Sequence, residues 1–154
     1  MRRSLPATEI KPKHLTMDLE TLRQFFAMSP YMADLGVEPV AVGEGTVSTV
    51  LTIAQRHHQH TGQVHAGVMA AMADHSMGSA AQTLASAGVW AITAELKTAQ
   101  LRPAKGDRLV CEAVVIKAGR TLSFTEAEVY AINGGQRTLV MKASATMALV
   151  PKKD

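Results

Sequence analysis

The sequence contains a single cysteine, Cys111, among its 154 residues. No disulfide can form within the chain, and this cysteine usage favours a reducing, cytoplasmic location. Aromatic residues make up only 4% of the sequence, too few for the stacking surfaces that bind single-stranded nucleic acids. Because no apolar run reaches the ~18 residues that a membrane-spanning helix needs, we predict no membrane partner.

Charged residues are also scarce, at 19%, and the formal net charge is +3. Much of the basic excess lies near the two ends of the chain, at Arg2, Arg3, Lys11, Lys13, Lys152 and Lys153. We interpret these residues as solvated tails and predict no nucleic-acid partner. The opening MRR is not followed by the apolar core of a signal peptide.

The length and the 47% hydrophobic content are typical of one globular domain. We predict a flexible leader over residues 1–15, one domain over 16–150 and a tail over 151–154. The segment TMDLETLRQFFAM has apolar residues at helical spacing and predicts a short helix, with Thr16 as its N-cap and Pro30 as its stop. Two β-rich segments around the turn GEG predict a hairpin over residues 35–54.

From Ala66 to about Ala87 the chain is rich in Ala and Met, which predicts a long helix with Gly88 as the residue that ends it. Four strand-like segments follow, at residues 90–101, 107–118, 121–132 and 137–150. The connections RPAKG, GR and NGG between them predict an antiparallel meander. In the third segment, alternation predicts two faces. One carries Leu122, Phe124 and Ala127 or Val129, and the other carries Ser123, Thr125, Glu126 and Glu128.

These elements predict an α+β fold, in which an antiparallel sheet of about six strands wraps around one long central helix and a short helix precedes them. The central helix is apolar on nearly all sides, so protein should cover most of it. Such a thin domain leaves the sheet edges open, which predicts pairing with a second copy of the chain.

The segment RHHQHTGQVHAG precedes the long helix and is dense in polar groups. The backbone N–H groups of Ala66, Gly67 and Val68 fall at the helix start, where no intrahelical carbonyl can accept from them. Together with the positive end of the helix dipole, these donors form a site for a carbonyl oxygen that acquires negative charge.

Asp74 lies in the middle of this apolar helix. Its neighbours one turn away are small or apolar, namely Ala70, Ala71, Met77 and Gly78. An acid in a helix interior is unfavourable and costly to bury without a partner. Two interpretations stay open: a partly solvated or backbone-bonded side chain, and a functional carboxylate.

The histidines His57, His58, His60 and His65 raise the question of a metal site. Their spacing matches no familiar zinc motif, so we predict no metal. We interpret the first three as surface or turn residues, and we expect His65 to hold the loop at the helix entry by hydrogen bonds. Cys111 lies in a strand without a local base and is interpreted as a buried structural thiol.

Four blocks, in this order, resemble the hot-dog-fold acyl-CoA thioesterases, in particular their phenylacetate-pathway (PaaI-like) branch. They are SPYMADLGVEPV, HTGQVHAGVMAAMADHSMGSAA, ITAELKTAQLRPAKGD and AGRTLSFTEAEVY, and they extend from about Ser29 to Leu149. The resemblance implies hydrolysis of an acyl-CoA, aromatic or medium-chain, to the free acid and coenzyme A. It implies no cofactor, because coenzyme A is part of the substrate.

The resemblance also implies a set of catalytic residues. Asp74, nine residues after His65, corresponds to the carboxylate that acts as nucleophile or as general base on water. The N–H of Ala66 would polarise the thioester carbonyl, Gln59 would lie near the thioester, and Thr93 would help to place the water. In the family the two halves of the site come from different subunits, which implies a homodimer and favours a homotetramer.

Residues implied in substrate binding are Gly67, Met77 and Gly78 for the acyl group and Arg102, Lys105 and Arg120 for coenzyme A. The sequence departs from the family's H-G-G at one position, where Ala66 replaces the first glycine. A methyl group at Ala66 disfavours a positive φ and narrows the approach to the carbonyl.

Two alternatives remain. One is a non-catalytic hot-dog domain that binds acyl-CoA as a sensor, although such regulators carry an added DNA-binding module. The other is a hot-dog hydratase, whose Asp and His act together. Asp74 and His75 point about 100° apart on a helix, which disfavours joint action.

Overall fold

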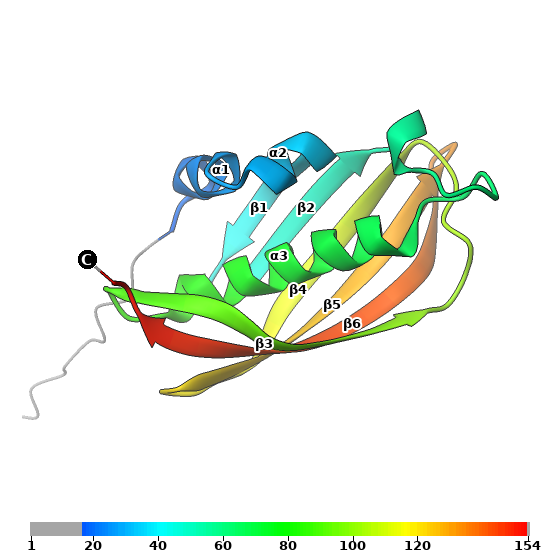
Figure 1. Cartoon of the computed structure of the whole chain (residues 1–154). Helices are drawn as coiled ribbons and strands as arrows, with labels where there is room; N and C mark the ends of the chain where they lie inside the picture. The colour runs from blue at the N-terminus through cyan, green and yellow to red at the C-terminus, as the bar shows by residue number, and fades with distance from the viewer. Residues whose placement is uncertain (1–16, 154) are drawn as a thin grey trace, which may run out of the picture.

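The computed structural model describes residues 17–153 (Figure 1). The predicted leader over residues 1–15 lies outside the described residues. In chain order the elements are α1 (Leu19–Ala27), α2 (Pro30–Leu35), β1 (Val37–Gly43), β2 (Thr46–Thr52), the 3-10 helix η1 (Gln55–His57), α3 (Ala66–Leu84), β3 (Val89–Gln100), β4 (Arg108–Ala118), β5 (Leu122–Asn133) and β6 (Gln136–Pro151). The last strand ends one residue beyond the predicted domain boundary.

The strands form one sheet in the order β1-β2-β4-β5-β6-β3, and every neighbouring pair is antiparallel. Figure 1 shows α3 lying across one face of this sheet, which curls around the helix. The predicted α+β fold, with about six strands around a central helix, is confirmed.

The predicted four-strand meander is wrong for β3. This strand pairs with β6 at the far edge of the sheet, and only β4, β5 and β6 follow one another as neighbours. The connection from β3 to β4 passes the start of α3, where the Ala104 carbonyl accepts from the N–H of Val64 at 3.0 Å. A connection of this length does not force its two strands to pair, unlike a tight hairpin turn. Because β3 pairs only with β6 in the sheet, it is an edge strand.

The helix ends differ from the predictions at three points. Asp18 is the N-cap of α1, its carboxylate accepting from the N–H of Thr21 at 2.8 Å, whereas Thr16 lies outside the described residues. Pro30 follows the end of α1 and also begins α2, a helix that the sequence analysis did not predict; proline is favourable at a first helical position. α3 ends at Leu84, because Ala85 already has an extended backbone, and Gly88 forms the following turn with a φ of 77°.

The core lies between α3 and the inner face of the sheet. Its largest fully buried apolar side chains include Met72 and Met77 from α3 and Leu51, Leu109, Val129, Met141 and Met147 from the sheet. Burying one such side chain contributes about 1.5–3 kcal/mol. Methionines are flexible and adapt to the curved inner surface of the sheet.

At the start of β5, polar residues occupy the buried face of the strand. Ser123 and Thr125 are buried, whereas Leu122 and Phe124 are 41% and 42% exposed on the outer face. The buried hydroxyl of Thr125 donates to the Ala145 carbonyl at 3.1 Å, which offsets its desolvation. Alternation therefore separated Leu122 and Phe124 from Ser123 and Thr125 correctly, although the first two lie outside the core. The prediction is wrong for Ala127 and Val129, which are buried on the same face as Ser123 and Thr125.

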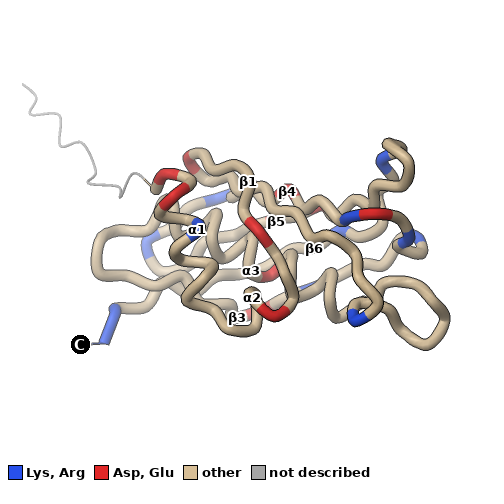
Figure 2. The backbone as a smooth tube through the Cα atoms, turned by 90° about the horizontal axis from the view of Figure 1, so that it is seen from above, with Lys and Arg blue, Asp and Glu red and all other residues tan. Residues whose placement is uncertain are grey.

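The outside of the protein carries mixed charge. Figure 2 shows Lys and Arg interspersed with Asp and Glu along the coloured part of the chain. None of the helices formed by residues 17–153 is long and apolar enough to span a bilayer.

Candidate active site

The start of α3 presents one unused backbone donor. The Nδ1 atom of His65 accepts from the N–H of Gly67 at 2.8 Å, and the His65 carbonyl accepts from the N–H of Val68 at 3.0 Å. Within residues 17–153, the N–H of Ala66 has no acceptor, and Ala66 is exposed. Of the three donors predicted at this helix start, only that of Ala66 is available to a ligand.

His65 thus holds the helix entry as expected, acting as the N-cap of α3. Gly67 permits this cap, because a Cβ at Gly67 would lie 3.0 Å from the His65 Nδ1 atom. Ala66 needs no glycine, since no described residue other than glycine has a positive φ. The replacement of glycine by Ala66 therefore causes no backbone strain at the donor.

Asp74 is half-buried and is held by a residue from the sheet. The hydroxyl of Thr93 on β3 donates to the Asp74 Oδ1 atom at 2.7 Å. Directly after Thr93 the β3–β6 register shifts, so that Ala94 forms a bulge. Bulges redirect side chains, and this one lies beside the residue that contacts the carboxylate. The structure therefore brings Asp74 and Thr93 together through a side chain rather than a backbone group.

The surface beside Asp74 is open. Gly78 lies one turn further along the same helix face, and a Cβ placed on it would meet no atom within 4 Å. Met77, in contrast, is fully buried in the core, so it is not exposed to a ligand in this chain. A ligand could therefore lie over Gly78, but it could not reach Met77 without movement of the core.

A shallow pocket of about 270 Å³ adjoins the free donor. Its lining includes three residues predicted for the site, Gln59, Ala66 and Arg102. Gln63 and Gln100 line it as well. Sequence reasoning did not find these two glutamines, since they belong to no local motif, and Gln100 lies here because β3 ends beside the start of α3.

Gln59 lies in the loop before α3. Its side-chain amide donates to the hydroxyl of Thr61 at 2.8 Å, and its backbone N–H donates to the Gln63 carbonyl at 2.8 Å. The amide is therefore held in place at the pocket by the loop itself.

The three predicted coenzyme A residues are not gathered in one place. Arg102 and Lys105 both lie on the connection that precedes β4, and Arg102 donates to the Leu139 carbonyl at 3.1 Å. Arg120 follows β4, so the eleven-residue strand separates it from Lys105 by about 33 Å. Only Arg102 and Lys105 lie at the same end of the sheet as Ala66.

Other titratable groups near α3 do not contribute to this site. Burial raises the pKa of the Cys111 thiol to about 12, which makes it a poor nucleophile. Burial also lowers the pKa of His75, whose ring packs on Phe25 and Phe26 and not beside a polar partner. In the described part of the chain, no three His, Cys, Asp or Glu side chains form a group that could hold a metal ion.

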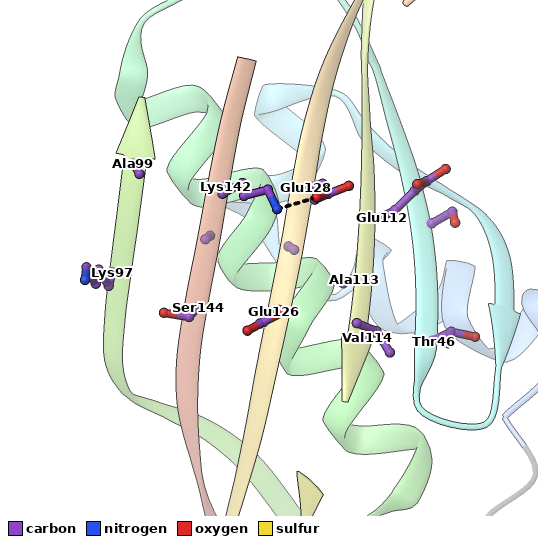
Figure 3. A pocket seen from close by; sticks show the side chains of 13 residues that line it. Thr46, Lys97, Ala99, Glu112, Ala113, Val114, Glu126, Glu128, Lys142 and Ser144 are labelled. Carbon is purple, nitrogen blue, oxygen red and sulfur yellow. Dashed lines mark ion pairs between the residues drawn. The ribbon is translucent and has the colours of Figure 1, made fainter. Parts of the chain in front are cut away.

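A larger hollow, of about 680 Å³, lies on the opposite face of the sheet (Figure 3). Lys97, Glu112, Glu126, Glu128 and Lys142 line it, and Lys142 pairs with Glu128 at 2.8 Å. The hollow contains neither the free donor of Ala66 nor the Asp74 carboxylate. Despite its size, this hollow is therefore separate from the candidate active site at α3.

Known proteins resemble this chain in sequence and fold. A sequence model of the thioesterase superfamily matches residues 61–138. A thioesterase family protein from Silicibacter pomeroyi is 31% identical, with a TM-score of 0.83 over 85% of this chain and 96% of that one. No curated protein matches the sequence.

Two further structures share the fold at lower identity. A thioesterase from Haemophilus influenzae is 22% identical, with a TM-score of 0.80 over 92% of this chain and 96% of that one. The PaaI protein of the phenylacetic acid degradation operon of E. coli is 18% identical, with a TM-score of 0.76 over 87% and 94%.

Proposed function

Because this chain belongs to the thioesterase superfamily and has its hot-dog fold, we propose that it hydrolyses acyl-CoA thioesters to a free acid and coenzyme A. The observation that carries the proposal is the 2.7 Å hydrogen bond from Thr93 to Asp74. It holds the only carboxylate of α3 beside open surface, and it joins two residues that the family pattern selects. A carboxylate fixed in this way is suited to act on a thioester or on water.

The free N–H of Ala66 is proposed as the donor to the thioester oxygen. This oxygen becomes negatively charged when the carbonyl carbon is attacked, and a prearranged N–H at a helix start stabilises that charge. Because His65 occupies the neighbouring N–H of Gly67, the oxyanion would meet one backbone donor.

Asp74 can act by either of two routes. As a general base it removes a proton from water while the water oxygen attacks the carbonyl carbon; the tetrahedral oxyanion then collapses, and the coenzyme A thiolate leaves and takes up a proton. As a nucleophile it displaces the thiolate to form a mixed anhydride, which water then hydrolyses. Both routes require Asp74 to be ionised.

The two groups of this mechanism do not meet within one chain. Ala66 and Asp74 are eight residues apart on α3, which corresponds to about 12 Å along the helix axis. The carboxylate and the free donor of a single chain therefore cannot serve the same carbonyl group, which supports a site shared between two chains.

An antiparallel pairing of β3 with the β3 of a second chain would supply the missing group. Asp74 contacts Thr93, and Ala66 shares its pocket with Gln100 at the other end of the strand. A twofold axis between Leu96 and Lys97 would place Thr93 opposite the partner's Gln100. Asp74 would then lie near the partner's Ala66, and the same would hold for the second site.

The pairing of the two β3 strands predicts that an added positive charge at its centre will separate the two chains. β3 is an uncovered edge strand, and Leu96 is 38% exposed. Leu96→Lys would set two lysines against each other on both sides of the axis, which is unfavourable across strands. We expect the mass in solution, measured by light scattering, to fall to half that of the wild type or less, with loss of activity.

Val40→Lys is the matched control, since Val40 is 44% exposed on β1 at the opposite edge of the sheet. This variant should keep both the mass and the activity of the wild type. A Leu96→Lys protein that keeps both the mass and the activity of the wild type would contradict the pairing of the two β3 strands.

A tetramer would form through the outer face of the sheet. Exposed apolar side chains gather there, including Val114, Ile116, Leu122 and Phe124. Monomeric proteins seldom expose such groups together. We therefore propose that two dimers meet on this face, while the dimer alone would complete the active site.

The proposed coenzyme A contacts are Arg102 and Lys105, which lie at the pocket end of the sheet. The open surface at Gly78 next to Asp74 suits an apolar acyl group, aromatic or of medium chain length. A cytoplasmic location, where such thioesters are made and used, remains a prediction from the single cysteine.

A panel of acyl-CoA thioesters tests the proposal, with release of free thiol as the readout. We expect turnover of at least one aromatic or medium-chain substrate without added metal. Binding of acyl-CoA without thiol release would instead indicate a sensor, and hydration of an enoyl-CoA would indicate a hydratase. Either outcome would refute the proposed hydrolysis.

A further inference from the structure

His57 lies at the junction of η1, α2 and the loop that leads to α3. From its place in the sequence, His57 is expected to be a surface or turn residue, but its side chain is only 1% exposed. A histidine that is buried at a loop junction needs partners for both ring nitrogens. The interpretation as a surface residue is therefore wrong for His57.

Both ring nitrogens of His57 have backbone partners. Nδ1 accepts from the N–H of Ala54 at 2.9 Å, and Nε2 lies 2.8 Å from the Leu35 carbonyl. An N–H can only donate and a carbonyl can only accept, so the proton must be on Nε2. These partners require one neutral tautomer.

The backbone of His57 anchors the entry of α3. Its carbonyl accepts from the N–H of His65 at 2.8 Å, and His65 directly precedes Ala66. A bridge between His58 and Val64 closes the loop in between, which carries Gln59. The ring therefore ties one end of this loop to α2, while the carbonyl ties the other end to α3.

We propose that His57 is a positioning residue of the thioesterase site, whose neutral ring fixes the loop that holds Gln59 and the N–H of Ala66 toward the thioester. The inference rests on the proposed function. His57 touches no reacting atom and acts through the carbonyl that it presents to His65.

The protonation state of His57 links this anchor to pH. Burial lowers the pKa of His57, with smaller contributions from the charges of Arg56 and His58, against the raising effect of the bond to Leu35. The unfolded chain therefore takes up a proton near pH 6.5 while the folded ring stays neutral. Stability contributed by this group should fall as the pH drops below about 6.5.

The first test needs no substrate. Nitrogen NMR of the wild-type protein at neutral pH should show His57 as the neutral Nε2–H tautomer, and the His65 amide should exchange slowly with solvent. An Nδ1–H tautomer, or a rapidly exchanging His65 amide, would overturn the inference whether or not the protein is a thioesterase.

The second test separates the two ring contacts. His57→Gln can keep donation to Leu35, and His57→Asn can keep acceptance from Ala54, so each variant loses one anchor. We expect kcat to fall about tenfold in each with KM changed less than about twofold, since misplacing a catalytic group slows the reaction more than it weakens binding. The His65 amide should exchange faster in both. His60→Gln, at an exposed loop position, is the control.

The outcomes distinguish the two proposals. A wild-type protein that cleaves no thioester refutes the proposed function, while the NMR measurements still decide the structural anchor. A folded His57→Gln protein with unchanged kcat and unchanged His65 exchange overturns the inference. If both variants unfold, acid titration of the wild type decides. We expect kcat and the protection of the His65 amide from exchange to decline together as the His57 resonances titrate. A kcat that changes independently of His65 protection overturns the inference.

Discussion

Replacing Asp74 with asparagine is expected to lower kcat/KM for thioester hydrolysis by roughly a thousandfold, within the range measured for general acid–base groups. Asparagine has nearly the same shape and can still accept the hydrogen bond that Thr93 donates at 2.7 Å in the wild type. It cannot take a proton from water or form an anhydride. The loss should therefore be chemical, with little change in thermal stability.

Thiol release measured under steady-state conditions, together with a thermal melt, checks this expectation. Asp34→Asn is the matched control, because Asp34 is an exposed carboxylate on α2, the helix that leads into β1 at the opposite edge of the sheet from β3. A folded Asp74→Asn protein with activity within tenfold of the wild type would show that another group performs the chemistry.

Single-turnover hydrolysis in water labelled with heavy oxygen would separate the two routes open to Asp74. In the nucleophilic route, water that attacks the Asp74 carbonyl carbon of the anhydride leaves its oxygen in the Asp74 carboxylate, so label in Asp74 identifies this route. In the general-base route, label appears only in the released acid.

Ala66→Pro is expected to lower kcat on the order of a hundredfold, the typical effect of losing an oxyanion donor. Ala66 is the first residue of α3, where proline fits the helix and removes only the backbone N–H. The preceding residue, His65, has φ −63° and ψ 135°, which is compatible with a following proline. The substitution therefore deletes one donor and should keep the helix.

Ala66→Gly is the control for this substitution. It keeps the N–H and removes only the methyl group, so it should retain activity and could widen the range of acyl groups accepted. Equal rates for Ala66→Pro and the wild type would show that the donor lies elsewhere.

Mixing the Asp74→Asn protein with the Ala66→Pro protein tests whether the site spans two chains. In a dimer of one Asp74→Asn chain and one Ala66→Pro chain, one site carries both substitutions and the other carries neither. Random pairing of equal amounts should therefore restore about a quarter of wild-type activity. If each site were built within one chain, every site would carry one defect and mixing would restore nothing.

Local patterns in the sequence were sufficient for most elements of the fold. The predicted strand segments agree with β3 to β6 to within two residues, because alternation, glycine turns and β-branched residues act over short distances. α2 was missed, since its six residues are too few for a helical period to show. The position of β3 was also missed, because pairing depends on where a connection leads the chain and not on the strand itself.

The candidate site also has features that the sequence predicts and features that only the structure shows. The start of α3 and its acid follow from residues close together in the sequence, and the Asp74–Thr93 pair was expected from the resemblance to the family. Which helix-start N–H is free, however, depends on how the His65 ring turns onto Gly67. The sequence pattern contains no information about that orientation.

The sequence by itself determined the elements, their order and the unusual acid on an apolar helix, because these depend on periodicity and on the cost of an isolated charge. Only the tertiary structure decided that Leu122 and Phe124 face outward, that β3 is a free edge, and that His57 is buried between α2 and α3. The physical reason is that burial and pairing arise from contacts between segments far apart in the chain. Alternation can divide a strand into two faces, but packing against α3 selects the face that is buried.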